Sequence, residues 1–310
     1  QADSIWQYPA AQNDLKNLLR HDPPDLVQTF LHHANVLGMH AASRCDIETR
    51  VGGIRVAQPR PLRSRIERIA LKRATSVVCV SEAVGKFAAD QLGCDPDSIL
   101  IIPNGVDVDR FQSAEPYDWS RLGWGRESLV TLFVGRLHSQ KGIELLQQEI
   151  DSLAPKGSHR RLLLVGDGPL KTALETWCRQ TGTDRVQLLP WQADVAPLMR
   201  ACTLFVLPSH YEGMPNVILE AMAAGKPVVS SLVEGSQELL AHASPQQGFP
   251  AGDARAMAAL AERLLDDEAM RAEIGRMNVT RVSDDFSIAS MCDAYRQHYL
   301  SLLERNRSDH

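Results

Sequence analysis

The sequence predicts an α/β fold with two domains, each built around a parallel sheet. The chain has 310 residues, which is enough for two domains of ordinary size. Its hydrophobic content of 44% and its charged content of 23% are typical of globular proteins. Short β-rich apolar runs alternate with segments of helical length along most of the chain. That alternation is typical of parallel strands joined by crossover helices.

The first part of the chain contains four predicted strands and four predicted helices. Ser81 is placed to cap the last of these helices, because its hydroxyl can accept a hydrogen bond from a free amide of the first turn. Gly52-Gly53 is expected to interrupt the second strand. The helices are expected near 8–20, 34–42, 61–74 and 81–92, and the strands near 25–30, 49–56, 76–80 and 99–102.

The second part shows a more regular alternation, typical of a Rossmann-like domain whose ligands lie beyond the carboxyl ends of its strands. We therefore expect a first domain over 1–111, a polar linker over 112–127, a second domain over 128–285 and a final helix over 286–310. Strands are expected near 128–135, 161–166, 185–189, 203–207 and 227–231, and helices near 142–153, 169–181, 194–201, 215–224, 253–266, 268–281 and 287–304.

The stretch from Thr203 to Val229 carries the strongest functional pattern. A buried strand leads through a polar loop into a helix that begins near Pro215 and ends at Gly225. The start of such a helix presents free amides and a partial positive charge, which suit an anion. Glu212 precedes the helix and Glu220 lies within it. Carboxylates on either side of an anion site suit an elongated ligand such as a nucleotide-sugar, with hydroxyls at both ends and phosphates between them.

Glu212 and Glu220 match the Glu-x7-Glu signature of retaining glycosyltransferases of the GT-B fold, in particular glycosyltransferase family 4. The run Glu-Gly-Met-Pro-Asn-Val-Ile-Leu-Glu-Ala-Met-Ala-Ala-Gly-Lys-Pro-Val-Val, residues 212–229, resembles that family nearly residue for residue. The resemblance implies a GT-B architecture, with two Rossmann-like domains facing a cleft and a last helix that crosses back to the first domain. It also implies retaining transfer of a sugar from a nucleotide-diphospho-sugar without a metal ion.

A second segment is similar to the family where the first strand of the second domain ends. Gly135-Arg136 and Lys141-Gly142 match its Gly-Arg-Leu…Gln-Lys-Gly pattern, in which the two cations hold the donor diphosphate. Fixed cations can neutralise the charge that develops on a leaving diphosphate. By resemblance Glu212 contacts the transferred sugar, Glu220 the ribose, and amides near 213–217 the phosphates. The expected catalytic residues are Glu212, Arg136 and Lys141, and the expected donor-binding residues are Gly135, Gly213, Met214, Asn216, Val217, Glu220 and Arg55.

The first domain departs from the family pattern. Arg55 occupies the place where many members carry a histidine that faces the donor sugar, and His32 and His33 follow an earlier strand. We find no glycine-rich loop of the kind that precedes these elements in the family. The sequence is therefore expected to lack the first part of the N-terminal domain, to bind nucleotide, and to transfer sugar poorly or not at all.

Two further features follow strands of the second domain. Gly166-Asp167-Gly168 resembles the start of a dinucleotide fingerprint, but Lys171 stands where a third glycine belongs, so we interpret it as a tight turn near the nucleotide. Trp191 and Gln192 are placed to border the base, and core packing of Trp191 is an equal alternative.

Charge and composition limit the partners and the compartment. A net charge of −5 gives no overall attraction to nucleic acid. No apolar run approaches the roughly 18 residues of a membrane span. The basic helix 61–74 leaves peripheral membrane contact open, although a solvated helix face is commoner.

Scattered cysteines and the absence of a signal peptide favour the cytoplasm. We expect no cofactor, a UDP- or GDP-linked donor and an unidentified acceptor. The alternatives are a GT-B nucleotide-sugar epimerase and a nucleotide-sugar-binding protein without turnover.

Overall fold

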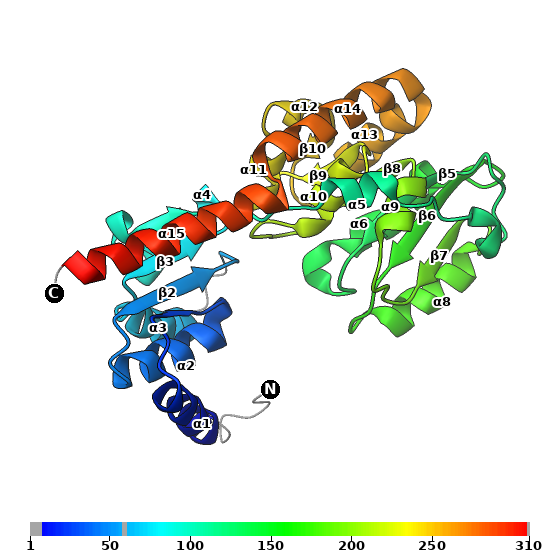
Figure 1. Cartoon of the computed structure of the whole chain (residues 1–310). Coiled ribbons are helices and arrows are strands. Elements are labelled where there is room, and N and C mark those ends of the chain that lie inside the picture. Colours follow the sequence, from blue (N-terminus) through cyan, green and yellow to red (C-terminus); the bar gives the residue numbers. More distant parts are fainter. Residues whose placement is uncertain (1–7, 58–60, 309–310) are drawn as a thin grey trace. The chain divides into compact units, whose positions relative to one another are not determined.

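The computed structural model describes residues 8–57 and 61–308, which form two compact units. One unit comprises the chain up to Asn104 together with the residues from Ala289 onward, and the other comprises Gly105–Ile288. Each unit contains one parallel sheet (Figure 1). The predicted α/β class with two parallel-sheet domains is confirmed.

The sheet of the first unit has its strands in chain order, β1-β2-β3-β4. Right-handed crossovers in a sheet with this order place the connecting helices on one face. The other face receives α15, whose Tyr295 and Tyr299 pack against the core formed by Val51, Val78 and Ile102. The strands are β1 (Leu26–Gln28), β2 (Thr49–Ile54), β3 (Ser76–Cys79) and β4 (Ile99–Ile101), and the helices are α1 (Tyr8–His21), α2 (Leu31–Arg44), α3 (Pro61–Leu71), α4 (Glu82–Leu92) and α15 (Ile288–Ser308).

Local sequence explains most of these elements. The Ser81 hydroxyl accepts a hydrogen bond from the amide of Val84 at 3.2 Å, as expected for the cap of α4. Gly93 ends that helix in the left-handed conformation. The prediction that Gly52-Gly53 interrupts the second strand is wrong, because β2 runs continuously from Thr49 to Ile54. Gly53 fits there because a β-carbon at this position would lie 2.6 Å from the carbonyl oxygen of Thr29.

The second unit carries a larger sheet with the order β10-β9-β8-β5-β6-β7. The five predicted strands are confirmed, and the two-residue strand β10 was not predicted because it is too short to show a pattern. The strands are β5 (Leu129–Val134), β6 (Arg160–Val165), β7 (Val186–Leu189), β8 (Leu204–Leu207), β9 (Val228–Ser231) and β10 (Gly248–Phe249).

Helices surround this sheet, and most of them were predicted. The segment expected as one helix over 142–153 forms two short ones, α6 (Ile143–Gln148) and α7 (Ile150–Leu153). Three helices were not predicted: α5 (Val108–Ser113), α11 (Glu234–Leu240) and α12 (Ser244–Gln247). The remaining helices are α8 (Lys171–Thr181), α9 (Ala196–Ala201), α10 (Asn216–Ala223), α13 (Ala254–Asp266) and α14 (Glu268–Asp285).

The segment 112–127, expected as a linker, lies within the second unit. Trp119 and Trp124 are buried there, and the indole of Trp124 donates to the carbonyl oxygen of Thr183 at 3.0 Å. The division of the structure therefore falls after Asn104 and after Ile288, at positions different from the expected boundaries at 111 and 285. Apolar burial of two indoles attaches this polar-looking segment to the second sheet.

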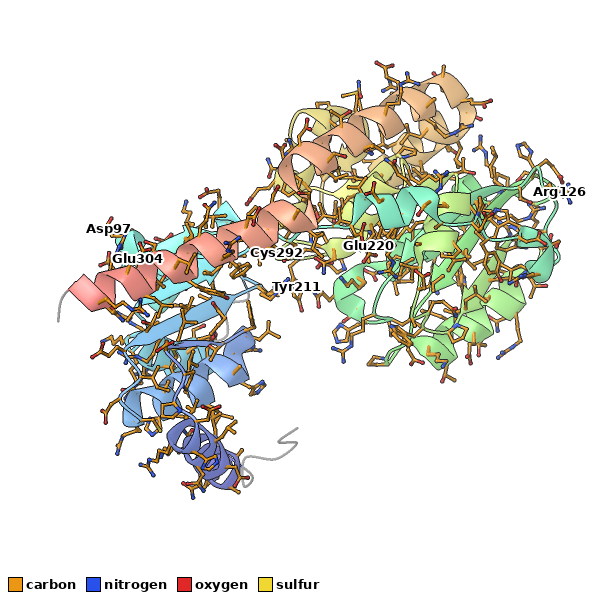
Figure 2. The ribbon with its side chains drawn as sticks, in the orientation of Figure 1. Asp97, Arg126, Tyr211, Glu220, Cys292 and Glu304 are labelled. Carbon is orange, nitrogen blue, oxygen red and sulfur yellow. The ribbon has the colours of Figure 1, made fainter. Side chains whose placement is uncertain are left out.

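Among the described residues, no helix combines the length and the apolar character needed to cross a bilayer. The six cysteines are free, and Cys292 is exposed on α15 (Figure 2).

Candidate donor-binding site

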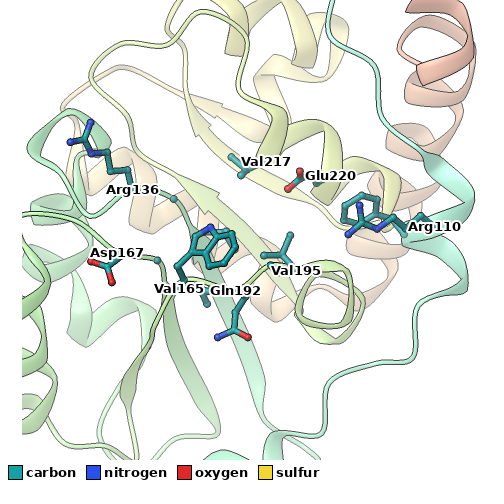
Figure 3. A pocket seen from close by; sticks show the side chains of 14 residues that line it. Arg110, Arg136, Val165, Asp167, Gln192, Val195, Val217 and Glu220 are labelled. Carbon is teal, nitrogen blue, oxygen red and sulfur yellow. The ribbon is translucent and has the colours of Figure 1, made fainter. Parts of the chain in front are cut away.

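A pocket of about 510 Å³ opens at the carboxyl ends of the second sheet. The strand order reverses direction between β5 and β8, since β6 follows β5 on one side and β9 follows β8 on the other. Crevices at such reversal points are the usual ligand sites of open α/β sheets. The pocket is lined from the end of β5 by Gly135 and Arg136, from the end of β6 by Gly166 and Asp167, and from α10 by Val217 and Glu220 (Figure 3).

Gly166 allows the ends of β5 and β6 to approach each other under this pocket. Its φ is +153°, and a β-carbon at this position would lie 1.9 Å from the carbonyl oxygen of Gly135. A side chain would therefore force the two strand ends apart. The Gly-Asp-Gly segment is therefore a sterically constrained stretch of backbone with the turn itself at Pro169 and Leu170, and Asp167 lines the pocket.

Glu220 is a partly buried carboxylate at one side of the pocket, and Arg136 lies at the other (Figure 3). Burial raises the pKa of Glu220 above its ordinary value of 4.5, while the nearby charge of Arg110 lowers it and that of Asp194 raises it. A desolvated carboxylate that points into a pocket is suited to accept hydrogen bonds from ligand hydroxyls.

Sequence reasoning missed Arg110 and Phe111, which also line the pocket. They belong to α5, which begins after Asp107; the Asp107 carboxylate accepts a hydrogen bond from the amide of Arg110 at 3.1 Å. The Arg110 guanidinium donates to Asp194 at 2.8 Å, an ion pair that is about half exposed. Asp107 ends the sequence run Asn104-Gly105-Val106-Asp107. This aspartate is a helix cap, and this could have indicated that a helix enters the second unit at that point.

Lys141 and Glu212 are brought together by the fold, beside the strand ends that form the pocket. The ammonium of Lys141 donates to Oε1 of Glu212 at 2.5 Å, and both side chains are largely buried. The hydroxyl of Ser209 donates to the same carboxylate oxygen at 2.6 Å. Gly142 permits this approach, because its φ is +63° and a β-carbon there would lie 1.9 Å from the carbonyl oxygen of Pro208.

The loop before α10 is tied to the loop that carries Lys141. The amide of His210 donates to the carbonyl oxygen of Gln140 at 2.8 Å, and the Gln140 side-chain amide donates to the carbonyl oxygen of Tyr211 at 3.0 Å. These two loops therefore hold Lys141 and Glu212 in one rigid arrangement. The amide of Glu212 also donates to Glu234 at 3.4 Å, which links the loop to α11.

The remaining residues expected at the donor site fall around the start of α10. Gly213 and Met214 are buried and Asn216 is exposed, and the described lining of the pocket includes none of the three. Pro215 is the N-cap of α10 and not its first helical residue, so the helix starts one residue later than predicted. Because proline has no side-chain acceptor, Pro215 does not cap the first amides of α10.

Arg55 lies in the first unit, directly after β2, with its guanidinium hydrogen-bonded to Asn104 and 6.0 Å from the centre of the Phe30 ring. His32 is paired with the buried Glu67 at 2.9 Å, which is a structural role within the same unit.

In the second unit Trp191 lines the pocket and is 68% exposed, so the alternative of core packing is wrong. Gln192 lines the pocket beside it.

Within the parts of the chain that the structure describes, no three histidine, cysteine, aspartate or glutamate side chains are grouped so that they could hold a metal ion.

Comparison with known proteins gives two family matches. Residues 2–110 match the model of Glycosyltransferase Family 4, and residues 128–267 match that of Glycosyl transferases group 1. The chain is 29% identical to the 2-deoxystreptamine glucosyltransferase of Streptomyces kanamyceticus, with 96% of this chain and 83% of the relative covered. It is 28% identical to an Escherichia coli enzyme described as UDP-Gal:alpha-D-GlcNAc-diphosphoundecaprenol alpha-1,3-galactosyltransferase, with 93% and 78% covered.

Solved structures agree on the fold. Anabaena HepE in complex with UDP and glucose matches with a TM-score of 0.83 at 24% identity, over 97% of this chain and 84% of the other. Sucrose-phosphate synthase from Thermosynechococcus elongatus matches with a TM-score of 0.84 at 23% identity, over 98% and 80%.

Proposed function

Because the chain belongs to the GT-B glycosyltransferases, with family 4 and group 1 domains, we propose that it transfers a sugar from UDP-sugar to a hydroxyl acceptor. We propose further that the transfer retains the anomeric configuration and needs no metal ion.

The observation that carries this proposal is that Glu220 and Arg136 line opposite sides of one pocket. This pocket lies at the point where the strand order of the sheet reverses. A volume of about 510 Å³ suits a nucleotide. The partly buried carboxylate of Glu220 would accept hydrogen bonds from the ribose hydroxyls, and the exposed guanidinium of Arg136 would bind the diphosphate. Trp191, at the pocket with most of its indole exposed, would stack on the base.

The diphosphate is the leaving group, so the protein must stabilise the charge that develops on it. Arg136 and Lys141 are cations beside the strand ends, with Lys141 held by Glu212, and the uncapped amides at the start of α10 add a partial positive charge. Together they would supply the electrostatic stabilisation that a divalent cation provides in other transferases. Metal-free transfer is therefore consistent with the residues at the site.

Glu212 is proposed to contact the transferred sugar. It lies in the loop before α10, where Lys141 and Ser209 hold its carboxylate in place. Gly213 and Met214 follow it directly, and Asn216 and Val217 begin the helix.

Retention follows if the acceptor hydroxyl attacks from the face of the sugar that the diphosphate leaves. In that geometry a diphosphate oxygen takes the hydroxyl proton as the glycosidic bond forms and the sugar–phosphate bond breaks. The cations that hold the diphosphate would then also determine the face of attack.

Uridine is proposed as the base, in preference to the guanosine that the sequence also allowed. The Escherichia coli relative is named for UDP-Gal, and the Anabaena structure contains UDP. These names support the choice because the Escherichia coli relative is similar to this chain in sequence and the Anabaena protein is similar to it in fold.

Calorimetric titration with UDP, GDP and ADP in the presence of EDTA tests the donor site. We expect UDP to bind most tightly and EDTA to have no effect. Glu220→Gln should weaken UDP binding roughly 10- to 150-fold, because a charge-assisted hydrogen bond contributes about 1.5–3 kcal/mol. Glu273→Gln, on the exposed part of α14, is the matched control and should bind as the parent does.

The reaction itself is tested by incubating UDP-sugars with and without hydroxyl acceptors and recording the anomeric proton couplings of the products. A product with the donor's configuration supports retention, and an inverted product contradicts it. Conversion of the donor without an acceptor would indicate epimerisation, and UDP binding without any product would indicate a binding protein.

A further inference from the structure

Helix α3 exposes a stripe of large aliphatic side chains. Leu62, Ile66 and Ile69 are 75%, 42% and 59% exposed. Their spacing of four and three residues places them along one side of the helix. Isolated exposed aliphatics are ordinary on protein surfaces, but three in line on an eleven-residue helix form a continuous apolar strip.

The segment 61–73, which carries the apolar strip, also contains several cationic side chains but no exposed carboxylate. Between residues 61 and 73 the acidic residue is Glu67, and it is buried. Its carboxylate accepts a hydrogen bond from the side-chain amide of Asn35 at 2.9 Å and pairs with His32 at 2.9 Å. The positive side chains of the segment are Arg63, Arg65, Arg68, Lys72 and Arg73.

The strip continues into an apolar groove of about 370 Å³ that is lined by residues of α1, α2 and α3. Ile66 and Ile69 form one wall, and Val36 and Leu37 of α2 are also part of the lining. We call the strip, the cations of 61–73 and this groove the α3 face. Its surroundings are positive as well: the pKa of His40, in the groove, is lowered by burial and then by Lys16, Arg44 and Arg73.

We propose that the α3 face docks on an anionic lipid bilayer, with α3 lying in the plane of the headgroups. A helix that lies in this plane places aliphatic side chains at the acyl boundary and long cationic side chains at the level of the phosphates. Both kinds of side chain are present on α3, and its carboxylate is turned inward. Charge complementarity therefore favours a negatively charged membrane surface as the occupant.

Vesicle flotation with the whole chain tests this docking. We expect the protein to float with vesicles containing phosphatidylglycerol, much less with pure phosphatidylcholine, and less with both as salt increases. Leu62→Ser and the pair Ile66→Ser/Ile69→Ser should reduce flotation at low salt. The charge reversal Arg65→Glu/Lys72→Glu should weaken binding by at least roughly tenfold, because each cation near an anionic surface contributes about a fivefold factor.

The matched control is Arg296→Glu/Leu300→Ser on α15, which changes one exposed cation and one aliphatic that is 49% exposed. This control should float as the parent does. Thermal unfolding of each variant verifies the fold, and Leu62→Ser, at the most exposed position, should leave the unfolding temperature unchanged.

Three results would overturn the proposal: no preference for anionic vesicles, equal losses in the α15 control, or self-association in light scattering that Leu62→Ser abolishes. The last would assign the α3 face to a second copy of the chain. No sugar donor is present in the flotation assay, so its outcome is independent of the proposed transfer reaction.

Discussion

The ammonium of Lys141 and the carboxylate of Glu212 form a 2.5 Å ion pair between residues that are 71 positions apart in the sequence. Their side chains are 15% and 9% exposed. Two of the residues proposed for catalysis therefore hold each other in position, and Ser209 fixes the shared oxygen of the carboxylate.

This pairing predicts a non-additive response to mutation. Glu212→Gln leaves the Lys141 charge largely buried without its partner, and Lys141→Met does the same to the Glu212 carboxylate, so each single change should destabilise the fold. In urea unfolding the double variant should lose less than the sum of the two, with a coupling of about 1.5–3 kcal/mol. Additive losses would show that the pair contributes nothing of its own.

Arg136 is predicted to act on the phosphates and not on the nucleoside. Arg136→Gln should weaken UDP binding by about 1.5–3 kcal/mol and leave the affinity for uridine unchanged, because the nucleoside has no charge for the guanidinium to contact. Calorimetry with both ligands measures the difference. Arg179→Gln, on the exposed side of α8, is the control for general loss of positive charge. An equal loss for uridine and UDP would contradict the assignment.

The raised pKa of Glu220 predicts a pH dependence of stability with a definite sign. Burial raises the pKa above the ordinary value of 4.5, so the folded protein binds this proton more tightly than the unfolded chain. The contribution of this residue is therefore most favourable below about pH 4.5 and is lost as pH rises through the folded pKa. Glu220→Gln removes the titration. It should gain stability relative to the parent as pH rises from 4.5 to 7, when urea unfolding is measured across that range.

Donor binding should show the opposite trend, because the ionised carboxylate is the better acceptor for ribose hydroxyls. UDP-glucose is the suitable ligand, since it lacks the terminal phosphate monoester, whose pKa is about 6. Its affinity for the parent should fall as pH is lowered toward 4.5, and that of Glu220→Gln should change little. A parallel decline in both proteins would place the titrating group elsewhere.

Gly166 is predicted to be intolerant of a side chain. Gly166→Ala places a β-carbon 1.9 Å from the carbonyl oxygen of Gly135, so the ends of β5 and β6 must separate and UDP affinity should fall with stability. Gly157→Ala is the matched control, because it also has a positive φ of +73° but meets nothing within 4 Å. It should cost only the backbone strain of about 1–3 kcal/mol and leave UDP affinity unchanged. Equal effects of the two would mean that the contact with Gly135 is unimportant.

Local patterns in the sequence determined the alternation of strands and helices, the Ser81 cap, and the strand–loop–helix unit that carries Glu212 and Glu220. These features depend on side-chain periodicity, turn residues and capping groups within a few positions of each other. The sequence by itself also placed Gly135 and Arg136 at the end of one strand and Val217 and Glu220 on the helix that follows another strand of the same sheet, and the pocket includes all four.

The tertiary structure alone decided what depends on residues far apart in the chain. It brought Arg110 of α5 into the pocket, paired Lys141 with Glu212, and attached the segment around Trp119 to the second unit. It also keeps β2 continuous across Gly52 and Gly53, because close packing against neighbouring backbone outweighs the low strand propensity of glycine. Strand order and long-range contact are set by how whole elements pack, and no local pattern encodes that packing.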